Sequence, residues 1–558
     1  MYRRPLLTLL AAALWLPLHG ICPRPDALMT LLTDELERER REFESADMPP
    51  YYMSYRVADE HDYHITAANG TVMRSYSRPS RKLTVQVRTG SRQFDNFHEM
   101  PNGQQPQAAV YHLADDDDLQ SIRRTLWIAT NREYNNAVAT YNQLQAGRGT
   151  DSNRTVSGDD YTAGDACEYS DKALAAGALS FDMDGWSRRL RDLSALFKPH
   201  ANIRNGSAVL SRTVSRNYFV STEGVRIAEN RCYAVLMLSA STCADDGMEI
   251  PLSKTYFAQH PDELPSEKRL AADIARMVEL LDSLRKAPTI TPYSGPALLA
   301  GGAAGVFFHE IFGHRVEGQR MRSGADGQTF RSMVGEQILP ESLSVIDDPT
   351  LARYNGMPMY GTYKYDEEGV RSERVTVVED GVLKDFLMSR MPLDGFTSSN
   401  GHGRAAAGKF PVSRQSNLIV ETSSGLTHDD MRRLLIEEAR EQGKEFGLLF
   451  MSVEGGLTNA TKFQPSAFNV FPNVVYKVFT DGRPDELVRG IDIVGTPLAI
   501  FSSISEAGGT PQTFIGMCAA ESGSIPVTAT SPDILVKKME VQKQSRNPLT
   551  LPLLPRPY

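Results

Sequence analysis

The chain lacks several features by which a sequence reveals its partners. Its 558 residues carry a formal net charge of −9, and no stripe of lysine and arginine is interleaved with aromatic residues, so nothing indicates a nucleic-acid surface. The apolar run from Leu6 to Leu18 is too short to span a bilayer comfortably. With 41% apolar and 23% charged residues, the chain is predicted to form two or more globular domains.

The N-terminus is typical of a secretory signal peptide. Arg3 and Arg4 precede the short apolar run, and a weak cleavage site follows near Gly20. We therefore expect residues 1–20 to be removed and the mature chain to begin near Ile21. The predicted location is periplasmic or extracellular, with no transmembrane segment in the mature chain.

Cysteine is scarce, with five in the whole chain. Four remain once Cys22, beside the predicted cleavage site, is set aside: Cys167, Cys232, Cys243 and Cys518. An oxidising compartment would permit a disulfide among the first three. Cys232 and Cys243 also bound a strand-like run as two buried thiols would. Both interpretations stay open, because pairing cannot be read from the sequence.

The first half of the chain, residues 25–287, is predicted to be a mixed α/β domain. Helices are expected at 26–44, behind the acidic run Asp115–Asp118, and at 266–286. Alternating apolar and polar residues around 50–57 and 81–90 predict half-buried strands.

A linker at 287–292 leads to a second domain, residues 288–545, which is predicted to be β-rich. Asp380-Gly381 and Asp481-Gly482 are hairpin signals between strand-like runs. One helix is expected at 428–442, with Thr427 as its N-cap. The proline-rich residues 546–558 are predicted to form an extended tail.

A short apolar stretch contains a His-Glu pair, His309-Glu310, and a second histidine, His314. Positions five apart lie about 140° apart around a regular α-helix, so a straight helix would separate the two rings. A single π-type turn would return them to one face. Gly313 permits such a distortion at low steric cost.

Two imidazoles on adjacent turns are good zinc ligands, and a catalytic zinc needs a third protein ligand. Spacing leaves that ligand open between Glu317, Asp347-Asp348 and Cys518, which lies in a Gly- and Ser-rich, loop-like setting. Glu310 is suited to take a proton from the attacking water. The histidines could equally be a satisfied core pair.

Two further stretches bear on function. The Gly-rich run Ala300–Gly305 lacks the Walker lysine and indicates close packing where the histidine helix begins. Asn400, His402 and Arg404 lie in a polar, Gly-rich stretch that could position a substrate or form a tight turn.

The stretch GGAAGVFFHEIFGHRVEGQR resembles the HExxxH signature of the TldD/PmbA family of metallopeptidases. Later stretches resemble that family in the same order, among them NGHGRAAAGKFPVSRQSNLIV and GMCAAESGSIPV, so that the resemblance extends from about Ser294 to Val527. It implies Zn²⁺ held by His309, His314 and Cys518, with Glu310 as the catalytic acid/base.

The resemblance also implies an α+β fold of two domains, an N-terminal α/β domain and a C-terminal β-rich, barrel-like domain that carries the metal-binding helix. The expected function is zinc-dependent hydrolysis of peptide bonds in extended or unfolded peptides, by a homodimer or by a heterodimer with a paralogue. Two alternatives are an inactive partner or binding subunit of a peptidase complex, and a thiol hydrolase that uses Cys518.

Overall fold

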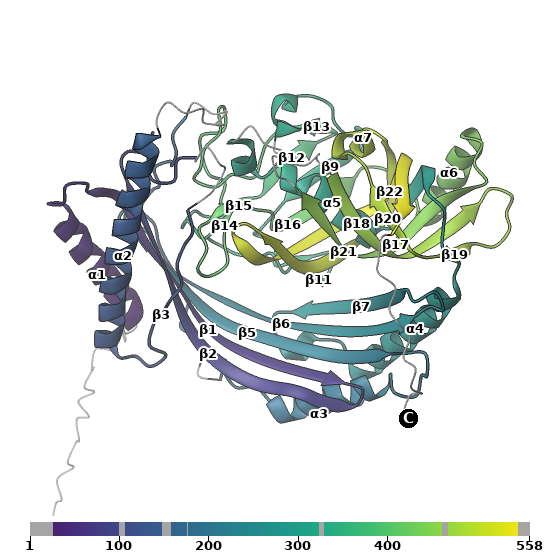
Figure 1. The fold of residues 1–558 in the computed structure, drawn as a ribbon, viewed down its shortest axis with the longest axis horizontal. Helices are drawn as coiled ribbons and strands as arrows, with labels where there is room; N and C mark the ends of the chain where they lie inside the picture. The colour runs from purple at the N-terminus through teal and green to yellow at the C-terminus, as the bar shows by residue number, and fades with distance from the viewer. Residues whose placement is uncertain are drawn as a thin grey trace, which may run out of the picture.

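The computed structural model contains two large β-sheets with helices packed against them (Figure 1). It describes residues 26–99, 106–147, 158–175, 177–322, 328–459 and 467–544. The predicted signal peptide at 1–20 and the predicted tail at 546–558 lie outside the described residues, so both stay predictions. In the part of the chain that is described, no helix combines the length and apolar composition that a bilayer span requires.

The first sheet is built from the N-terminal half of the chain. Its strand order is β3-β2-β1-β5-β6-β4, and β7 also pairs with β6. β1 and β2 are joined at Asn69-Gly70, which both have positive φ, as a two-residue hairpin turn requires. The strands are β1 (Pro50–Ala68), β2 (Thr71–Thr89), β3 (Tyr111–His112), β4 (Glu168–Ser170), β5 (Asn205–Ser221), β6 (Arg226–Cys243) and β7 (Glu249–Ala258).

The helices of this half begin behind the polar residues that the sequence indicates. Asp118 accepts hydrogen bonds from the backbone N–H groups of Gln120 and Ser121, which confirms that the acidic run begins a helix. Asp26 and Ser266 cap the two other predicted helices in the same way. The helices are α1 (Ala27–Phe43), α2 (Leu119–Ala146), α3 (Met183–Ala195) and α4 (Glu267–Lys286), with a short 3-10 turn, η1 (Pro261–Glu263).

These helices bury two separate apolar cores against the sheet. α1 and α2 pack on β1, β2 and β5, whereas α3 packs on β1, β2 and β5 and α4 packs on β6 and β7. The sheet is curved, and its concave face is turned toward the C-terminal half of the chain (Figure 1).

The second sheet is built from the C-terminal half. Its order is β13-β12-β9-β16-β22-β20-β18-β17-β8, with β19 paired to β18 and β21 paired to β22. β8 pairs with both β17 and β22, so the strand order returns to β22. The strands are β8 (Tyr293–Leu299), β9 (Leu343–Asp347), β12 (Val375–Glu379), β13 (Val382–Leu383), β16 (Asn417–Thr422), β17 (Phe446–Asn459), β18 (Ala467–Phe479), β19 (Glu486–Val488), β20 (Ile491–Val494), β21 (Ile504–Ala520) and β22 (Gly523–Lys543).

Several local predictions for this half are confirmed. Asp380-Gly381 joins the antiparallel strands β12 and β13, and Asp481-Gly482 lies between the paired strands β18 and β19. Thr427 forms a capping box at the start of α6. The remaining elements are α5 (Gly301–Ile311), α6 (His428–Glu441), α7 (Pro497–Phe501), the small hairpins β10 (Arg353–Tyr354) with β11 (Met357–Pro358) and β14 (Gly403–Arg404) with β15 (Val412–Ser413), and the 3-10 turns η2 (Gly313–Arg315), η3 (Gly318–Arg322) and η5 (Arg331–Met333).

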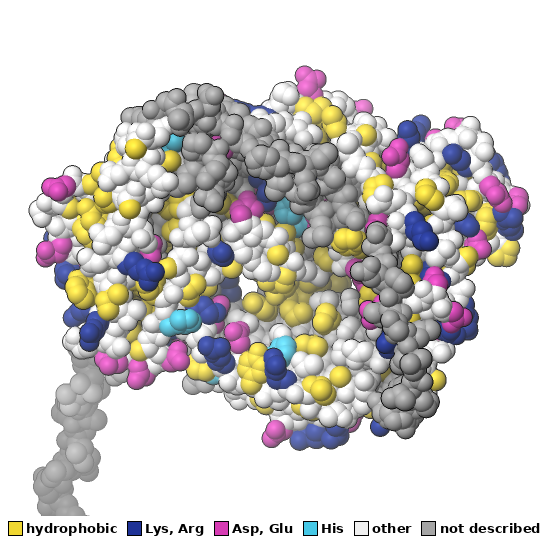
Figure 2. Space-filling model, viewed as in Figure 1, with side chains coloured by type: hydrophobic (Ala, Val, Ile, Leu, Met, Phe, Trp, Pro, Cys, Tyr) yellow, Lys and Arg dark blue, Asp and Glu magenta, His cyan; other side chains and the backbone are white. Residues whose placement is uncertain are grey.

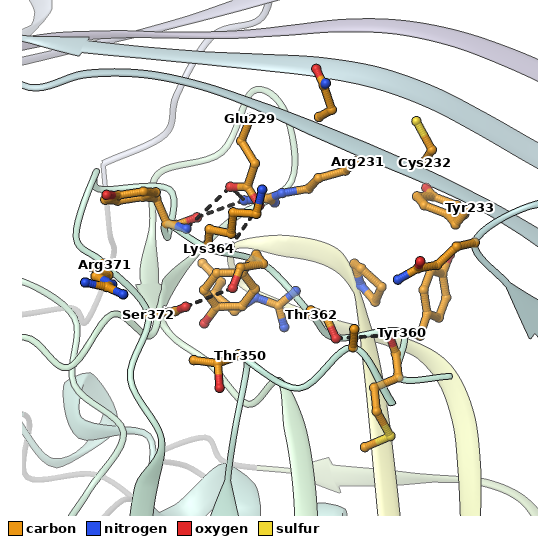
Figure 3. Close-up of a pocket in the computed structure, with 18 of the residues that line it drawn as sticks. Glu229, Arg231, Cys232, Tyr233, Thr350, Tyr360, Thr362, Lys364, Arg371 and Ser372 are labelled. Atoms are coloured by element: carbon orange, nitrogen blue, oxygen red, sulfur yellow. Dashed lines mark hydrogen bonds and ion pairs between the residues drawn. The ribbon is translucent and has the colours of Figure 1, made fainter. Parts of the chain in front are cut away.

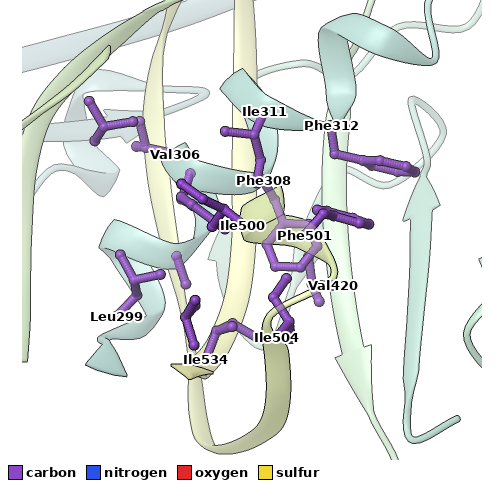
Figure 4. Packing of buried hydrophobic residues seen from close by; sticks show 14 of the residues in the cluster. Leu299, Val306, Phe308, Ile311, Phe312, Val420, Ile500, Phe501, Ile504 and Ile534 are labelled. Carbon is purple, nitrogen blue, oxygen red and sulfur yellow. The ribbon is translucent and has the colours of Figure 1, made fainter. Parts of the chain in front are cut away.

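Helix α5 lies very close to strand β22, as the glycines at its start predict. A Cβ atom at Gly301 would lie 2.5 Å from the carbonyl oxygen of Ser531, and one at Gly305 would lie 2.6 Å from that of Ala529. On another side of the helix, Phe312 stacks on Phe501 with ring centroids 5.0 Å apart. Figure 4 shows this apolar packing around α5 and α7.

The close approach of α5 to β22 generates a stability prediction. Gly305→Ala should lower the free energy of unfolding by about 1–3 kcal/mol, because the added methyl group meets backbone atoms of Ala529 that cannot turn aside. Chemical denaturation of the purified chain measures the change.

Gly302→Ala on the same helix is the matched control, since its Cβ atom would meet nothing closer than Gln512 Oε1 at 3.7 Å. It should leave stability unchanged or raise it by up to about 1 kcal/mol through helix propensity. Equal stability of the two variants would contradict the packing argument.

Candidate metal centre

The end of helix α5 decides where the two histidines point. The helix stops at Ile311, Phe312 has φ −116° and ψ −55°, and Gly313–Arg315 form a 3-10 turn. The π-type turn that could have brought the two rings to one face does not form. Arg315 donates from one guanidinium nitrogen to the carbonyl oxygens of Glu310 and Ile311 at 2.9 and 3.0 Å, so this cation satisfies carbonyl groups that the helix end leaves open.

Gly313 is required for contact and not for an unusual backbone angle. An ideal Cβ atom there would lie 1.8 Å from Oε1 of Gln415. Gln415 in turn donates from Nε2 to the carbonyl oxygen of His309 at 3.2 Å. The side chain of Gln415 thus occupies the space beside Gly313 and also contacts the backbone at His309.

Cys518 lies on strand β21 and not in a loop, so the loop-like setting predicted for it is wrong. It pairs in register with Ile525 of β22, and it is 8% exposed in a small buried cluster with Ile525 and Val527. Helix α5, on which the histidine motif begins, packs on β22. Because β21 pairs with β22 in this register, the sulfur of Cys518 lies next to the histidines. In the described part of the chain all four cysteines are free thiols, and Cys232 and Cys243 are half-buried on β6.

The three predicted ligands meet at one point. The Sγ atom of Cys518 lies 3.3 Å from Nε2 of His309 and 3.4 Å from Nε2 of His314. The two imidazole rings stand nearly perpendicular, with centroids 4.9 Å apart, and one ligand atom from each residue lies within 4.8 Å of the others. Among the described residues, this is the group of three or more that has metal-binding geometry.

Glu317 is not a third ligand but a partner of His314. Its Oε2 atom lies 3.1 Å from Nδ1 of His314, on the opposite side of the ring from Cys518. Arg320 donates to the same oxygen at 2.7 Å, and Arg414 lies 3.6 Å from the other. Burial alone would raise the pKa of Glu317, but the charges of His314 and Arg320 hold it below its usual range. A carboxylate in this position fixes the ring and its tautomer.

The electrostatics favour a thiolate at Cys518. Burial raises the pKa of a thiol, but the adjacent rings of His309 and His314 lower the pKa of Cys518 to about 4. For His314, burial lowers the pKa, whereas the charges of Glu317 and Cys518 raise it to about 10. Two imidazoles and a thiolate form a donor set that fits zinc and leaves a fourth position open.

Glu310 lies on α5 next to strand β17. A Cβ atom at Gly456 would lie 2.4 Å from Cγ of Glu310, so the glycine is needed for this side chain to fit. Glu310 is 9% exposed. Glu310 follows the candidate ligand His309 in sequence, and a buried carboxylate next to a ligand suits proton transfer.

The other candidate residues do not join the cluster. Asp347 is buried and accepts from the backbone N–H of Ser416 at 3.1 Å, while its Oδ1 atom lies 3.2 Å from His402 Nε2. Asn400 accepts from the backbone N–H of Met388 at 2.7 Å. The stretch that contains Asn400 and His402 turns at Gly401, with φ +73°, which supports the interpretation as a tight turn.

Sequence reasoning missed Gln415 and Arg315, and it treated Glu317 as a competing ligand. The sequence held one usable signal, since Glu317 lies three residues after His314, the spacing at which a helical turn brings side chains together. Nothing in the sequence indicated Gln415, because its contacts depend on the tertiary fold.

The fold and the site define a class: an α+β protein of two sheet-based halves in which a helix end and a strand hold a His, His, Cys cluster beside a glutamate. Residues 292–543 match the PmbA/TldA metallopeptidase C-terminal domain. Residues 292–543 therefore belong to the PmbA/TldD family as its C-terminal domain, and the match contains the stretch on which the resemblance rested.

Known relatives agree with this membership. A protein named Metalloprotease from Archaeoglobus fulgidus is 32% identical over 264 residues, which cover 47% of this chain and 56% of that protein. A Zinc metalloprotease TldD homolog from Saccharolobus solfataricus is 26% identical over 253 residues, or 45% of this chain and 52% of that protein. The chain spans about half the length of the curated relatives it matches.

The fold extends over a larger share of the chain than the sequence match. The crystal structure of TldE from Thermococcus kodakarensis superposes with a TM-score of 0.61 at 13% identity, and the superposition covers 92% of this chain and 100% of that chain. The predicted α+β class is confirmed. The exact domain boundaries stay predictions.

The contact between Glu317 and His314 generates a prediction about metal affinity. Glu317→Gln should weaken zinc binding by about 10- to 100-fold, because a neutral amide orients the imidazole less firmly than a carboxylate does. Competition with a chromophoric chelator measures the affinity.

Glu521→Gln is the matched control, since Glu521 pairs with the same Arg320 at 2.9 Å. It should leave zinc affinity unchanged. If both variants lost affinity equally, Glu317 would act through Arg320 and not through His314.

Proposed function

We propose that this chain is a zinc-dependent metallopeptidase that hydrolyses peptide bonds in extended or unfolded peptides. The observation that supports it most is the convergence of His309, His314 and Cys518, whose ligand atoms lie within 4.8 Å of one another in the interior. Membership of the PmbA/TldD family supports a peptidase function independently. Donor chemistry favours zinc, because a thiolate with two imidazoles suits it better than magnesium or calcium.

The chain's own residues divide the work of hydrolysis. A zinc ion held by the three ligands would polarise the scissile carbonyl and acidify the attacking water. Glu310 accepts a proton from that water and returns it to the leaving amine nitrogen. Glu317 keeps Nδ1 of His314 engaged, so that Nε2 stays directed toward Cys518.

A thiol hydrolase that uses Cys518 is the second candidate. A low thiol pKa and adjacent histidines would serve that chemistry too. However, the sulfur contacts Nε2 of both histidines and is 8% exposed. A nucleophile needs one base and an open approach for the substrate, so this arrangement suits a metal ligand better than a nucleophile. An inactive partner subunit is the third candidate, and it would show no peptide hydrolysis.

We also propose that the chain is exported and that it acts as a dimer, with a second copy or with a paralogue. The signal-like N-terminus supports export. The resemblance to the TldD/PmbA family, which implies dimeric assembly, supports the pairing. N-terminal sequencing and light scattering of the mature protein address these two statements.

The role of Glu310 yields a prediction that separates proton transfer from metal binding. Glu310→Gln should keep one zinc per chain but lower peptide hydrolysis by about 100-fold or more, because an amide cannot shuttle the proton. Metal analysis and a peptidase assay measure the two effects. His309→Ala is the comparison, and it should lose the zinc. Loss of zinc from the Glu310 variant would make that residue a ligand instead.

Alkylation of Cys518 separates the peptidase from the thiol hydrolase. Zinc protects a coordinated thiolate, so iodoacetamide should spare Cys518 in the zinc-loaded protein and modify it after chelation, while hydrolysis ceases. Mass-spectrometric mapping follows each cysteine, with the half-buried Cys232 and Cys243 as internal references. Rapid alkylation of Cys518 in the native protein, together with full activity in EDTA, would reverse the assignment.

A further inference from the structure

A cavity of about 720 Å³ lies between the two halves of the molecule. We call it the inter-sheet cavity. One wall comes from residues 229–233 of β6 and from the end of β7, and the other from residues 350–372 of the C-terminal half, with Arg404 and Pro526 (Figure 3). The face seen in Figure 2 is hollowed between the two halves, with apolar side chains in the hollow.

The inter-sheet cavity is separate from the metal cluster. Cys518 pairs with Ile525 and faces the cluster, whereas Met517 pairs with Pro526, which lines the cavity. Adjacent residues of a strand point to opposite faces. The β21–β22 hairpin therefore stands between the two sites, and the cavity needs an explanation of its own.

One part of the cavity wall is aromatic. The ring of Tyr360 lies 4.5 Å from that of Phe257 and 5.1 Å from that of Tyr233, measured between centroids. Met359 and Pro526 add aliphatic surface. A concave, largely apolar wall around a volume of this size is typical of a site for a small organic molecule.

The other part of the wall is cationic. Four basic side chains line the cavity, with Glu229 as the acidic one: Arg231, Lys364, Arg371 and Arg404. Two of them form ion pairs, Arg231 with Glu367 at 2.7 Å and Lys364 with Asp171 at 2.5 Å. Glu229 already has a hydrogen-bond partner, because it accepts from the backbone N–H of Lys364 at 2.9 Å.

Arg371 and Arg404 form no ion pair within the described ranges of the chain. Arg404 is 2% exposed; it donates to the carbonyl oxygen of Gln415 at 2.6 Å and lies 4.8 Å from the ring centroid of Tyr363, but its Nε atom has no hydrogen-bond partner among the described residues. The carboxylate whose charge acts on Arg404 is Glu367, but Glu367 is ion-paired with Arg231 at 2.7 Å, so the two guanidinium groups share one carboxylate. Arg371, which is exposed, lines the same cavity.

We propose that the inter-sheet cavity binds an organic carboxylate. The carboxylate group pairs with Arg404 and Arg371, and the apolar or aromatic body of the ligand packs against Tyr233, Phe257 and Tyr360. A free C-terminal carboxylate of a peptide and a small N-acyl amino acid share this chemistry. The site requires neither zinc nor hydrolysis, so it stands apart from the proposed peptidase function.

Calorimetric titration of the full-length, zinc-loaded chain with N-acetylphenylalanine tests the proposal. The acid should bind. N-acetylphenylalanine amide should bind at least about tenfold more weakly, because the charged, hydrogen-bonded pair is lost. Arg371→Gln should weaken binding of the acid by a similar factor and leave binding of the amide unchanged.

Arg374→Gln is the matched control, since Arg374 is exposed nearby and does not line the cavity. It should bind the acid as the wild type does. Equal affinity for acid and amide, no effect of Arg371→Gln, or equally tight binding of inorganic phosphate would each overturn the proposal.

A second pair of probes distinguishes the two sources of the carboxylate. The peptide Ala-Ala-Ala-Phe and its C-terminal amide are titrated into the wild type and into Glu310→Gln, in which cleavage is not expected to disturb the signal. Tighter binding of the peptide acid than of N-acetylphenylalanine assigns the site to peptide C-termini, and the reverse order assigns it to small acids. If neither acid binds, the proposal fails, whatever the peptidase assay shows.

Discussion

The metal centre depends on how closely helix α5 lies on strand β22. Gly301 and Gly305 have no Cβ atoms, which lets the helix approach the backbone of Ser531 and Ala529. Strand β22 also sets the position of its neighbour β21, and hence of Cys518. The distance from sulfur to imidazole is therefore fixed by backbone packing. A site built on a helix end and a strand is more rigid than one built on loops.

Buried polar contacts then hold this geometry. Glu317 joins His314, Arg320 and Arg414 in the interior, so that each buried charge has a partner of opposite sign. Gln415 extends the network, because its backbone N–H donates to Glu317 and its side chain donates to the carbonyl of His309. Removing one member would leave others unsatisfied. The ligands are thus positioned even before an ion contributes.

Local chemistry in the sequence predicted the features that neighbouring residues decide. Thr427 and the acidic run before α2 indicated helix starts, and two Asp-Gly pairs indicated hairpins. The prediction that was wrong treated one segment alone. Cys518 was assigned to a loop from its Gly- and Ser-rich neighbours, but pairing with β22 makes it part of a strand. The π-type turn that the sequence permitted does not form, and Gln415, which lies 102 residues beyond Gly313 in sequence, fills the space beside the 3-10 turn that does.

The sequence likewise did not predict how one half of the molecule lies over the other. Ion pairs join the halves, among them Arg390 with Glu223 and Arg231 with Glu367, both at 2.7 Å. Charged contacts of this kind fix orientation but do not fill the space between two curved surfaces as apolar packing would. A cavity is therefore left between the halves. Arg231 forms an ion pair there with Glu367, whereas Arg404 on the facing wall forms no ion pair with a described residue and shares the charge of the same Glu367. That asymmetry locates positive charge at one end of the cavity, and it makes an anion the natural complement.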